Sequence, residues 1–342
     1  MDAHIEHLLH DPLAAAREAK QQRQRVIGYI GDIPVELIFA ANALPVRLRG
    51  VAGANASRAE QYLDSSFVPE TRAILEQWLC GQLNFLDAVI FPRSDDSAQR
   101  LYYYICELQR TKRCDGPAPL LFDVATIPRH TSLDHTIDSM RRLATALSAD
   151  LTKLPAAIER VKQRRQSIDK LPPGSESFNL ARAAEYDWRN TFDTLLRTST
   201  STTKAARVVF AGSAPPDARM HRAVESTGGV IAAEFTDIQL GPMNGNDPLT
   251  ALAERHHRVL TPAQAMLHTP QCLVKLARRT HAKGAVLWAI EEDEALPWEI
   301  ARQAQILKAA NIPVLLLTRQ KWLADDATLN VIAQFVRGLE SR

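Results

Sequence analysis

The chain has 342 residues, of which 46% are hydrophobic and 23% are charged. This balance is typical of a soluble globular protein, and the length predicts two domains of ordinary size. The formal net charge is +2, from 41 basic and 39 acidic residues, so the global field favours neither nucleic acid nor an anionic membrane as a partner. Because no uncharged apolar run reaches the roughly 18 residues of a spanning helix and the first residues lack a signal-peptide pattern, we expect a cytoplasmic protein.

The first half of the chain alternates between apolar runs and helical periodicity. Residues 1–24 predict an exposed amphipathic N-terminal helix. Alternation of strands and helices then indicates a parallel sheet covered by helices. The helices expected are 36–43, 71–83 and 97–110, and the strands expected are Arg25–Ile30, Val46–Leu48, Ala88–Phe91 and Leu120–Phe122.

The second half repeats this alternation after a helical stretch. From about residue 132 the strands give way to charged helical periodicity, as in Asp138–Lys162. Strands are expected again at Arg207–Phe210, Gly229–Ala233, Ala285–Ala289 and Val314–Leu317. We therefore predict an α/β fold of two Rossmann-like domains with parallel sheets joined by a helical segment. The predicted parts are an N-terminal helix (1–24), an N-terminal α/β domain (25–131), a helical connecting segment (132–204) and a C-terminal α/β domain (205–342).

Cysteine and histidine spacing gives no metal-binding motif. None of Cys80, Cys106, Cys114 and Cys272 forms a Cys-x-x-Cys pair, so the pattern favours reduced structural thiols. His256 and His257 are adjacent, which places them on different faces of a helix and predicts a surface position.

Two stretches carry a resemblance to a known family. In Val26–Gly50, Gly28 and Tyr29 end a strand, and Pro34 and Glu36 open a helix. Residues 91–104 read FPRSDDSAQRLYYY. With these motifs the chain resembles the 2-hydroxyacyl-CoA dehydratase and benzoyl-CoA reductase family, of the 2-hydroxyglutaryl-CoA dehydratase D-component type. Asn42 stands where the family usually has glycine, and both residues tolerate a left-handed backbone at a helix end.

The resemblance also identifies three positions at which the family binds an iron–sulfur cluster through cysteine. They are occupied here by Val68, Asp95 and Glu292. Valine has no donor atom, and a carboxylate is a poor substitute for a thiolate at such a cluster. The flanking residues still match, namely Pro69, Arg72, Asp96, Ser97, Arg100 and Leu101. The resemblance thus implies a degenerate member with no cofactor in this chain.

In the family, two homologous subunits pair and act on acyl-CoA thioesters. The resemblance therefore implies a cluster-free subunit that contributes an acyl-CoA pocket or docks a partner, with the 4Fe-4S cluster carried by a homologous partner subunit. A homodimer and a stand-alone small-ligand (acyl-CoA) binding or regulatory protein remain alternatives. A third possibility is a hard cation held by Asp95 and the run Glu291–Asp293, although acidic runs after strands more often start solvated helices.

Candidate ligand residues follow from the expected strand ends, because doubly wound sheets bind ligands beyond the carboxyl ends of their strands. We expect Asn42–Pro45, Arg93–Ser97, Gly212–Ala214 and Glu291–Asp293 to converge on one cleft, with Val68 at its wall. Arginines near these loops could bind CoA phosphates or form ordinary surface ion pairs. The candidate cleft residues are Asn42, Arg72, Arg93, Asp96, Ser97, Arg100 and Ser213.

Overall fold

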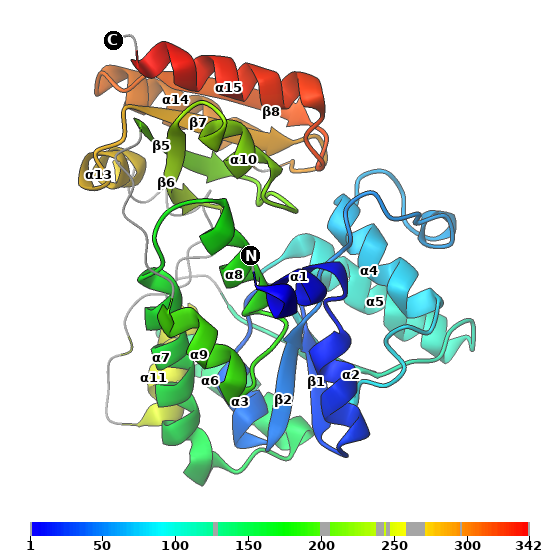
Figure 1. Ribbon diagram of the computed structural model, residues 1–342. Helices are drawn as coiled ribbons and strands as arrows, with labels where there is room; N and C mark the ends of the chain where they lie inside the picture. Colours follow the sequence, from blue (N-terminus) through cyan, green and yellow to red (C-terminus); the bar gives the residue numbers. More distant parts are fainter. Residues whose placement is uncertain are drawn as a thin grey trace. The chain divides into compact units, whose positions relative to one another are not determined.

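The structure is a computed structural model that describes residues 2–125, 129–198, 206–236, 243, 247–257, 271–294 and 296–340. The chain divides into two compact units, and each contains a four-stranded, fully parallel sheet with helices packed against it (Figure 1). The predicted α/β class with two parallel sheets is confirmed.

Sheet A lies in the first unit and has the strand order β2-β1-β3-β4. Its strands are β1 (Arg25–Tyr29), β2 (Ala43–Arg47), β3 (Ala88–Pro92) and β4 (Ala118–Phe122). The chain moves from β1 to β2 on one side and then returns to add β3 on the other side of β1. The point at which the strand order reverses is therefore between β1 and β3.

Apolar strands place the core of the first unit on both faces of this sheet. All five residues of β3 are buried, and Trp78, Phe91 and Phe122 are among the largest fully buried side chains. The helices are α1 (Ala3–His10), α2 (Ala14–Gln21), α3 (Val35–Ala40), α4 (Pro69–Leu79), α5 (Asp96–Arg110), α6 (His130–Leu147), α7 (Leu154–Asp169), α9 (Asn190–Thr198) and α11 (Pro248–His257).

The N-terminal segment differs from the single exposed helix expected there. It forms α1 and α2, with Pro12 in the break between them, where a proline disfavours the helical conformation of the residue before it. Leu8, Ala16 and Ala19 are at most 1% exposed. The small side chains of α2 let this helix pack closely on β1 and β2, so the segment is part of the core.

Helix α3 ends earlier than predicted, at Ala40 rather than Ala43. Asn42 has φ +54°, a left-handed conformation that asparagine tolerates, and this conformation stops the helix. As a result β2 begins at Ala43, three residues before the expected strand.

Sheet B lies in the second unit and repeats the same topology, with the order β6-β5-β7-β8. Its strands are β5 (Ala206–Gly212), β6 (Gly229–Phe235), β7 (Gly284–Ile290) and β8 (Val314–Gln320). Helices α10 (Arg219–Glu225) and α15 (Asp326–Glu340) pack together and against this sheet, as do α13 (Cys272–Arg279) and α14 (Leu296–Ala309). The strand order reverses between β5 and β7.

The two units exchange short pieces of chain, and the predicted domain bounds stay a prediction. Residues Leu240–Val259, which contain α11, belong to the first unit although they fall within the predicted C-terminal domain (205–342). Residues Leu171–Asn179 belong to the second unit, and α8 (Ser175–Ala183) holds residues of both.

Among the helices in the described part of the chain, none combines the length and the apolar character that a membrane crossing requires.

Candidate functional site

Two loops meet at the carboxyl edge of sheet A, where the strand order reverses. One is Ile30–Ile33, which follows β1, and the other is Arg93–Asp95, which follows β3. The backbone N–H of Ile30 donates to the carbonyl of Ile90 at 3.0 Å, so the two strand ends lie side by side. Ligands of doubly wound sheets bind in the crevice at such a point.

Four charged or titratable side chains beside β1 form a buried group, which we term the carboxyl-edge cluster: Asp32, Glu36, Arg255 and His256. Glu36 lies in the first turn of α3 and is fully buried. Its Oε1 accepts a hydrogen bond from the guanidinium of Arg255 at 2.6 Å. The carboxylate of Asp32 lies 2.8 Å from Nδ1 of His256. The β1–α3 segment thus supplies both acids, and α11 supplies both bases.

The surrounding charges keep both acids of the cluster ionised. Burial by itself would raise the pKa of Glu36, but the positive charges of Arg255 and Arg165 lower that pKa below its usual value. Burial also opposes ionisation of Asp32, and the charge and hydrogen bond of His256 lower the pKa of Asp32 in turn. The cluster therefore holds two carboxylates beside fixed cations, shielded from water.

Three polar atoms of the carboxyl-edge cluster have no hydrogen-bond partner in the part of the chain that the structure describes. They are Oε2 of Glu36, Nε of Arg255 and Nε2 of His256, on residues that are 0%, 7% and 2% exposed. A buried polar atom left unpaired costs about 1–3 kcal/mol. The acceptor on Glu36 and the donor on Arg255, with the ring nitrogen of His256 beside them, are suited to bind a small polar group.

Sequence reasoning missed this cluster, and the surface position expected for His256 is wrong. The His256 ring packs edge-on against Phe122, with 5.6 Å between ring centroids. The sequence did contain a signal for Asp32 and Glu36: two acidic residues flank a proline directly after a strand, a position where ligand-binding residues are common. Their partners could not be identified, because they lie 219 residues (Arg255) and 224 residues (His256) further along the chain.

The first two predicted cluster-ligand positions lie at the starts of neighbouring helices. Val68 is the N-cap of α4 and is half-buried. Asp95 is the exposed N-cap of α5, and its carboxylate accepts a hydrogen bond from the backbone N–H of Ala98 at 2.9 Å. Glu292 lies in the second unit, just after β7, and is half-buried.

The donor atoms at these positions do not fit an iron–sulfur cluster, which requires thiolates. One side chain is a hydrocarbon, and a second already caps a helix. Cysteine does not replace them, because Cys80 is exposed at the end of α4 and Cys106 lies on α5. Cys114 follows α5, and Cys272 begins α13. Within the described ranges, no three or more His, Cys, Asp or Glu side chains are gathered as a metal ion would need.

The acidic run Glu291–Asp293 has the geometry of a helix start. The carboxylate of Asp293 accepts a hydrogen bond from the backbone N–H of Leu296 at 3.0 Å, which caps α14. Glu291 lies 3.8 Å from the guanidinium of Arg319. These contacts favour the solvated helix start over a site for a hard cation.

The candidate arginines already have partners within the protein. Arg93 donates to both carboxylate oxygens of Asp123 at 2.9 Å. Arg100 stacks over the ring of Phe67 at 3.8 Å and lies 3.9 Å from Asp96. Arg72 is half-buried in the first turn of α4, and Ser97 lies in the first turn of α5. These arginines lie on the carboxyl side of sheet A, but none has a free guanidinium directed at a cleft.

Ser213 lies at the strand reversal of sheet B, where β5 ends beside β7. Its backbone N–H donates to the carbonyl of Trp288 at 2.9 Å, and its hydroxyl oxygen accepts from the N–H of Ile290 at 3.1 Å. The backbone N–H of Ser213 is therefore already used within the sheet and is not available to bind a phosphate. The single cleft predicted for both sheets stays a prediction.

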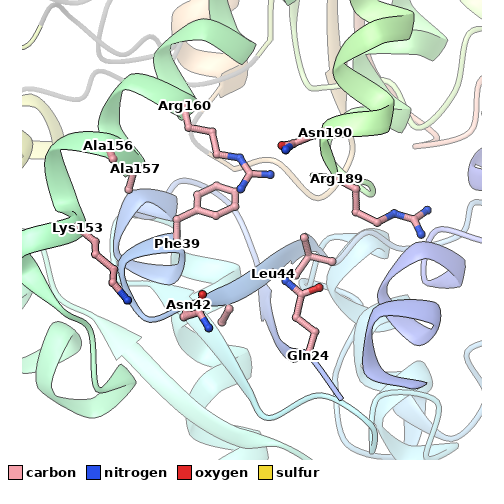
Figure 2. A pocket seen from close by; sticks show the side chains of 11 residues that line it. Gln24, Phe39, Asn42, Leu44, Lys153, Ala156, Ala157, Arg160, Arg189 and Asn190 are labelled. Atoms are coloured by element: carbon pink, nitrogen blue, oxygen red, sulfur yellow. The ribbon is translucent and has the colours of Figure 1, made fainter. Parts of the chain in front are cut away.

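Asn42 lies at the opposite, amino edge of sheet A, because it precedes β2 beside the start of β1. The sequence had led us to expect that Asn42 and Asp95 would share one cleft, but the two residues lie at opposite edges of the sheet. Asn42 instead lines an open hollow of about 500 Å³, which we term the amino-edge hollow (Figure 2). The lining residues are Gln24, Phe39, Asn42, Ala43, Leu44, Lys153, Ala156, Ala157, Arg160, Arg189 and Asn190.

Comparison with known proteins gives one family. The model described as 2-hydroxyglutaryl-CoA dehydratase, D-component, matches residues 31–331. This range contains both sheets except for the first strand, β1 (Arg25–Tyr29). No curated protein matches the chain.

Proposed function

The chain belongs to the 2-hydroxyglutaryl-CoA dehydratase D-component family, and we propose that it is a cluster-free component of a dehydratase-type complex, whose iron–sulfur cluster is carried by a homologous partner subunit. Its role there would be to form an acyl-CoA pocket and to dock that partner. The reaction class is elimination of water from a 2-hydroxyacyl-CoA or reduction of an aromatic acyl-CoA.

The observation that carries this proposal is an intact framework around unsuitable ligand positions. Val68 and Asp95 occupy the N-caps of α4 and α5, so the local backbone is that of a regular helix start at both. Their side chains offer no thiolate, and neither does Glu292. A chain that keeps this framework without thiolates is suited to binding and assembly, because the redox chemistry of such enzymes belongs to the cofactor.

The carboxyl-edge cluster supports an acyl-ligand pocket in the first unit. It lies at the strand reversal, the usual ligand position of this fold, and presents unpaired polar atoms of Glu36, Arg255 and His256. A hydroxyl and a carbonyl oxygen of an acyl group would meet an acceptor and a donor there. Arg93, which is half-exposed at 50% of its side chain, could exchange Asp123 for a CoA phosphate.

Anaerobic co-purification tests the proposed assembly. The tagged chain is expressed with a homologue that keeps all three cluster cysteines, and the eluate is analysed for subunit ratio and for iron and sulfide. We expect a complex in which the iron content follows the homologue. Recovery of the chain without any homologue would overturn partner docking and would favour the stand-alone binding protein.

Calorimetric titration of the purified chain with a 2-hydroxyacyl-CoA tests the pocket. Arg93→Met should weaken binding about tenfold, as expected for the loss of a charge-assisted hydrogen bond. Arg141→Met is the control, since Arg141 forms an exposed pair with Asp138 on α6. Equal affinity of the two variants for the acyl-CoA would contradict a role of Arg93. Binding by the chain alone, with no partner captured, would support the alternative of a stand-alone acyl-CoA binding protein.

A further inference from the structure

The amino-edge hollow has a basic lining on the side of sheet A opposite to the proposed acyl pocket. Its lining contains Lys153, Arg160 and Arg189, together with the amides of Gln24, Asn42 and Asn190, and none of its lining residues is acidic. Figure 2 shows Arg160 above the ring of Phe39, with Asn190 across from it and Lys153 and Arg189 at the two ends. The lining therefore offers cationic and amide N–H donors, which are groups that suit an anion.

Arg160 is held in place for binding. Its guanidinium stacks over the Phe39 ring at 4.2 Å, and it donates a hydrogen bond to the carbonyl oxygen of Trp188. Among the described residues, no carboxylate lies within ion-pair distance of it. The charge of Asp193 acts on Arg160 from beyond ion-pair distance. A guanidinium that is oriented by an aromatic ring loses little entropy when it binds an oxyanion.

The other two cations are partly neutralised within the protein. Arg189 forms ion pairs with Asp187 and Glu18, each at 2.7 Å. Lys153 is 58% exposed and lies 3.9 Å from Asp150. Asp187 and Glu18 offset the charge of Arg189, and Asp150 offsets part of the charge of Lys153. Arg160 is therefore the lining cation that forms no ion pair among the described residues.

Two helices begin at this hollow. Asn190 is the first residue of α9, and Ala156 and Ala157 lie in the first turn of α7. The N-terminus of a helix carries a partial positive charge and backbone N–H groups without intrahelical acceptors. The start of α9 therefore adds to the attraction for an anion. Helix α7 continues directly from a 3-10 turn, in which the carbonyl of Leu151 accepts from the N–H of Leu154, and its alanines leave room for a ligand.

We propose that the amino-edge hollow is a second ligand site, which binds the phosphate group of a small organic molecule with Arg160 as its principal ligand. Phosphate suits a forked guanidinium together with helix N-termini. At about 500 Å³ the hollow is larger than a phosphate ion, and Phe39 and Leu44 offer an apolar floor for the rest of the molecule.

Calorimetric titration of the full chain with inorganic phosphate at low ionic strength tests this proposal, with acetate as the control anion. We expect saturable 1:1 binding of phosphate and much weaker binding of acetate. Arg160→Met should weaken phosphate binding about tenfold or more, the effect of removing a charge-assisted hydrogen bond. Lys162→Met is the matched control, because Lys162 lies on the same helix, pairs with Glu159 and does not line the hollow.

Ala156→Asp provides a test that does not depend on the stability of the Arg160 variant. A carboxylate in the first turn of α7 favours the helix, yet it would repel a bound phosphate. We expect a stable variant that binds phosphate at least about tenfold more weakly. Phosphate binding that is absent from the unmodified chain, or that persists unchanged in Ala156→Asp, would overturn the proposal.

Titration with adenosine monophosphate and ribose 5-phosphate then distinguishes the source of the phosphate. If adenosine monophosphate binds more tightly than ribose 5-phosphate, its base contacts the apolar floor. If the two affinities are equal, the site is one for sugar phosphates. Because the readout is phosphate binding at the amino edge, the result is independent of acyl-CoA binding and of partner docking.

Discussion

Glu36 illustrates how one residue couples two distant parts of the sequence. It is 0% exposed, and a buried carboxylate stays ionised only beside a counter-charge. We expect Glu36→Gln to lower the free energy of unfolding by about 3 kcal/mol, because Arg255 would keep a buried charge without its partner. Urea denaturation measures this loss. The double variant Glu36→Gln/Arg255→Met should be less destabilised than the sum of the two single variants, and strictly additive losses would contradict the coupling.

Gly212 is required by its backbone conformation at the end of β5. It has φ +123°, and a Cβ there would lie 1.8 Å from the carbonyl oxygen of Trp288. Gly212→Ala should therefore destabilise the second unit by about 3 kcal/mol or more, since both strain and a backbone clash result. Gly338→Ala is the control, because a Cβ at Gly338 meets nothing within 4 Å and alanine favours a helix by about 1 kcal/mol. Thermal unfolding of both variants checks this: the melting temperature should fall for Gly212→Ala and rise for Gly338→Ala.

At the residue scale, the sequence predicts what local chemistry determines. The helix expected after β3 (97–110) is present as α5, which begins at Asp96 after the N-cap Asp95. Asn42 has the left-handed φ of +54° that asparagine tolerates at a helix end. The burial of His256 follows from contacts with Asp32 and Phe122. No local pattern encodes such long-range contacts.

At the scale of elements, Glu185 joins the end of β2 to the chain that follows α8. Its carboxylate forms ion pairs with Arg47 and with Arg49, the latter at 2.9 Å. Burial alone would raise the pKa of Glu185, but the charges of the two arginines lower it to about 2. The folded protein thus binds this proton less readily than the unfolded chain does.

The sign of the resulting pH dependence follows from this lowered pKa. A carboxylate with an ordinary pKa of 4.5 in the unfolded chain and about 2 in the folded protein stabilises the fold by about 3 kcal/mol above pH 4.5. That contribution is lost as the pH falls toward 2. We expect the difference in unfolding free energy between the unmodified chain and Glu185→Gln to shrink between about pH 5 and pH 3. A difference that stays constant over this range would contradict the assignment.

The strands were predictable, whereas the assignment of one helix to its unit was not. The eight strands of the described residues follow from short apolar runs such as Ala88–Pro92, which is buried at every position. Helix α11 has ordinary amphipathic composition. Nothing in its own sequence shows that it belongs to the first unit, where it packs on α6, although the segments on both sides of it belong to the second. This placement brings Arg255 and His256 to the carboxyl edge of sheet A.

At the scale of the whole molecule, the family and the side chains of this chain lead to different expectations about the cofactor. The family match extends over residues 31–331, which include parts of both units. The ligand positions hold a valine and two carboxylates, whose chemistry does not suit iron–sulfur binding. The division of labour that we propose, between a cluster-bearing subunit and this chain, would reconcile the two.

Iron and sulfide analysis of the chain alone tests this account most directly. The chain is expressed and purified under anaerobic conditions, reconstituted with iron and sulfide, desalted, and examined by metal analysis and electron paramagnetic resonance after reduction. The cysteine-complete homologue, treated in parallel, is the positive control and should retain about four irons per chain. We predict that the present chain retains no stoichiometric iron or sulfide and gives no cluster signal. About four irons per chain with a reduced-cluster spectrum would contradict the account.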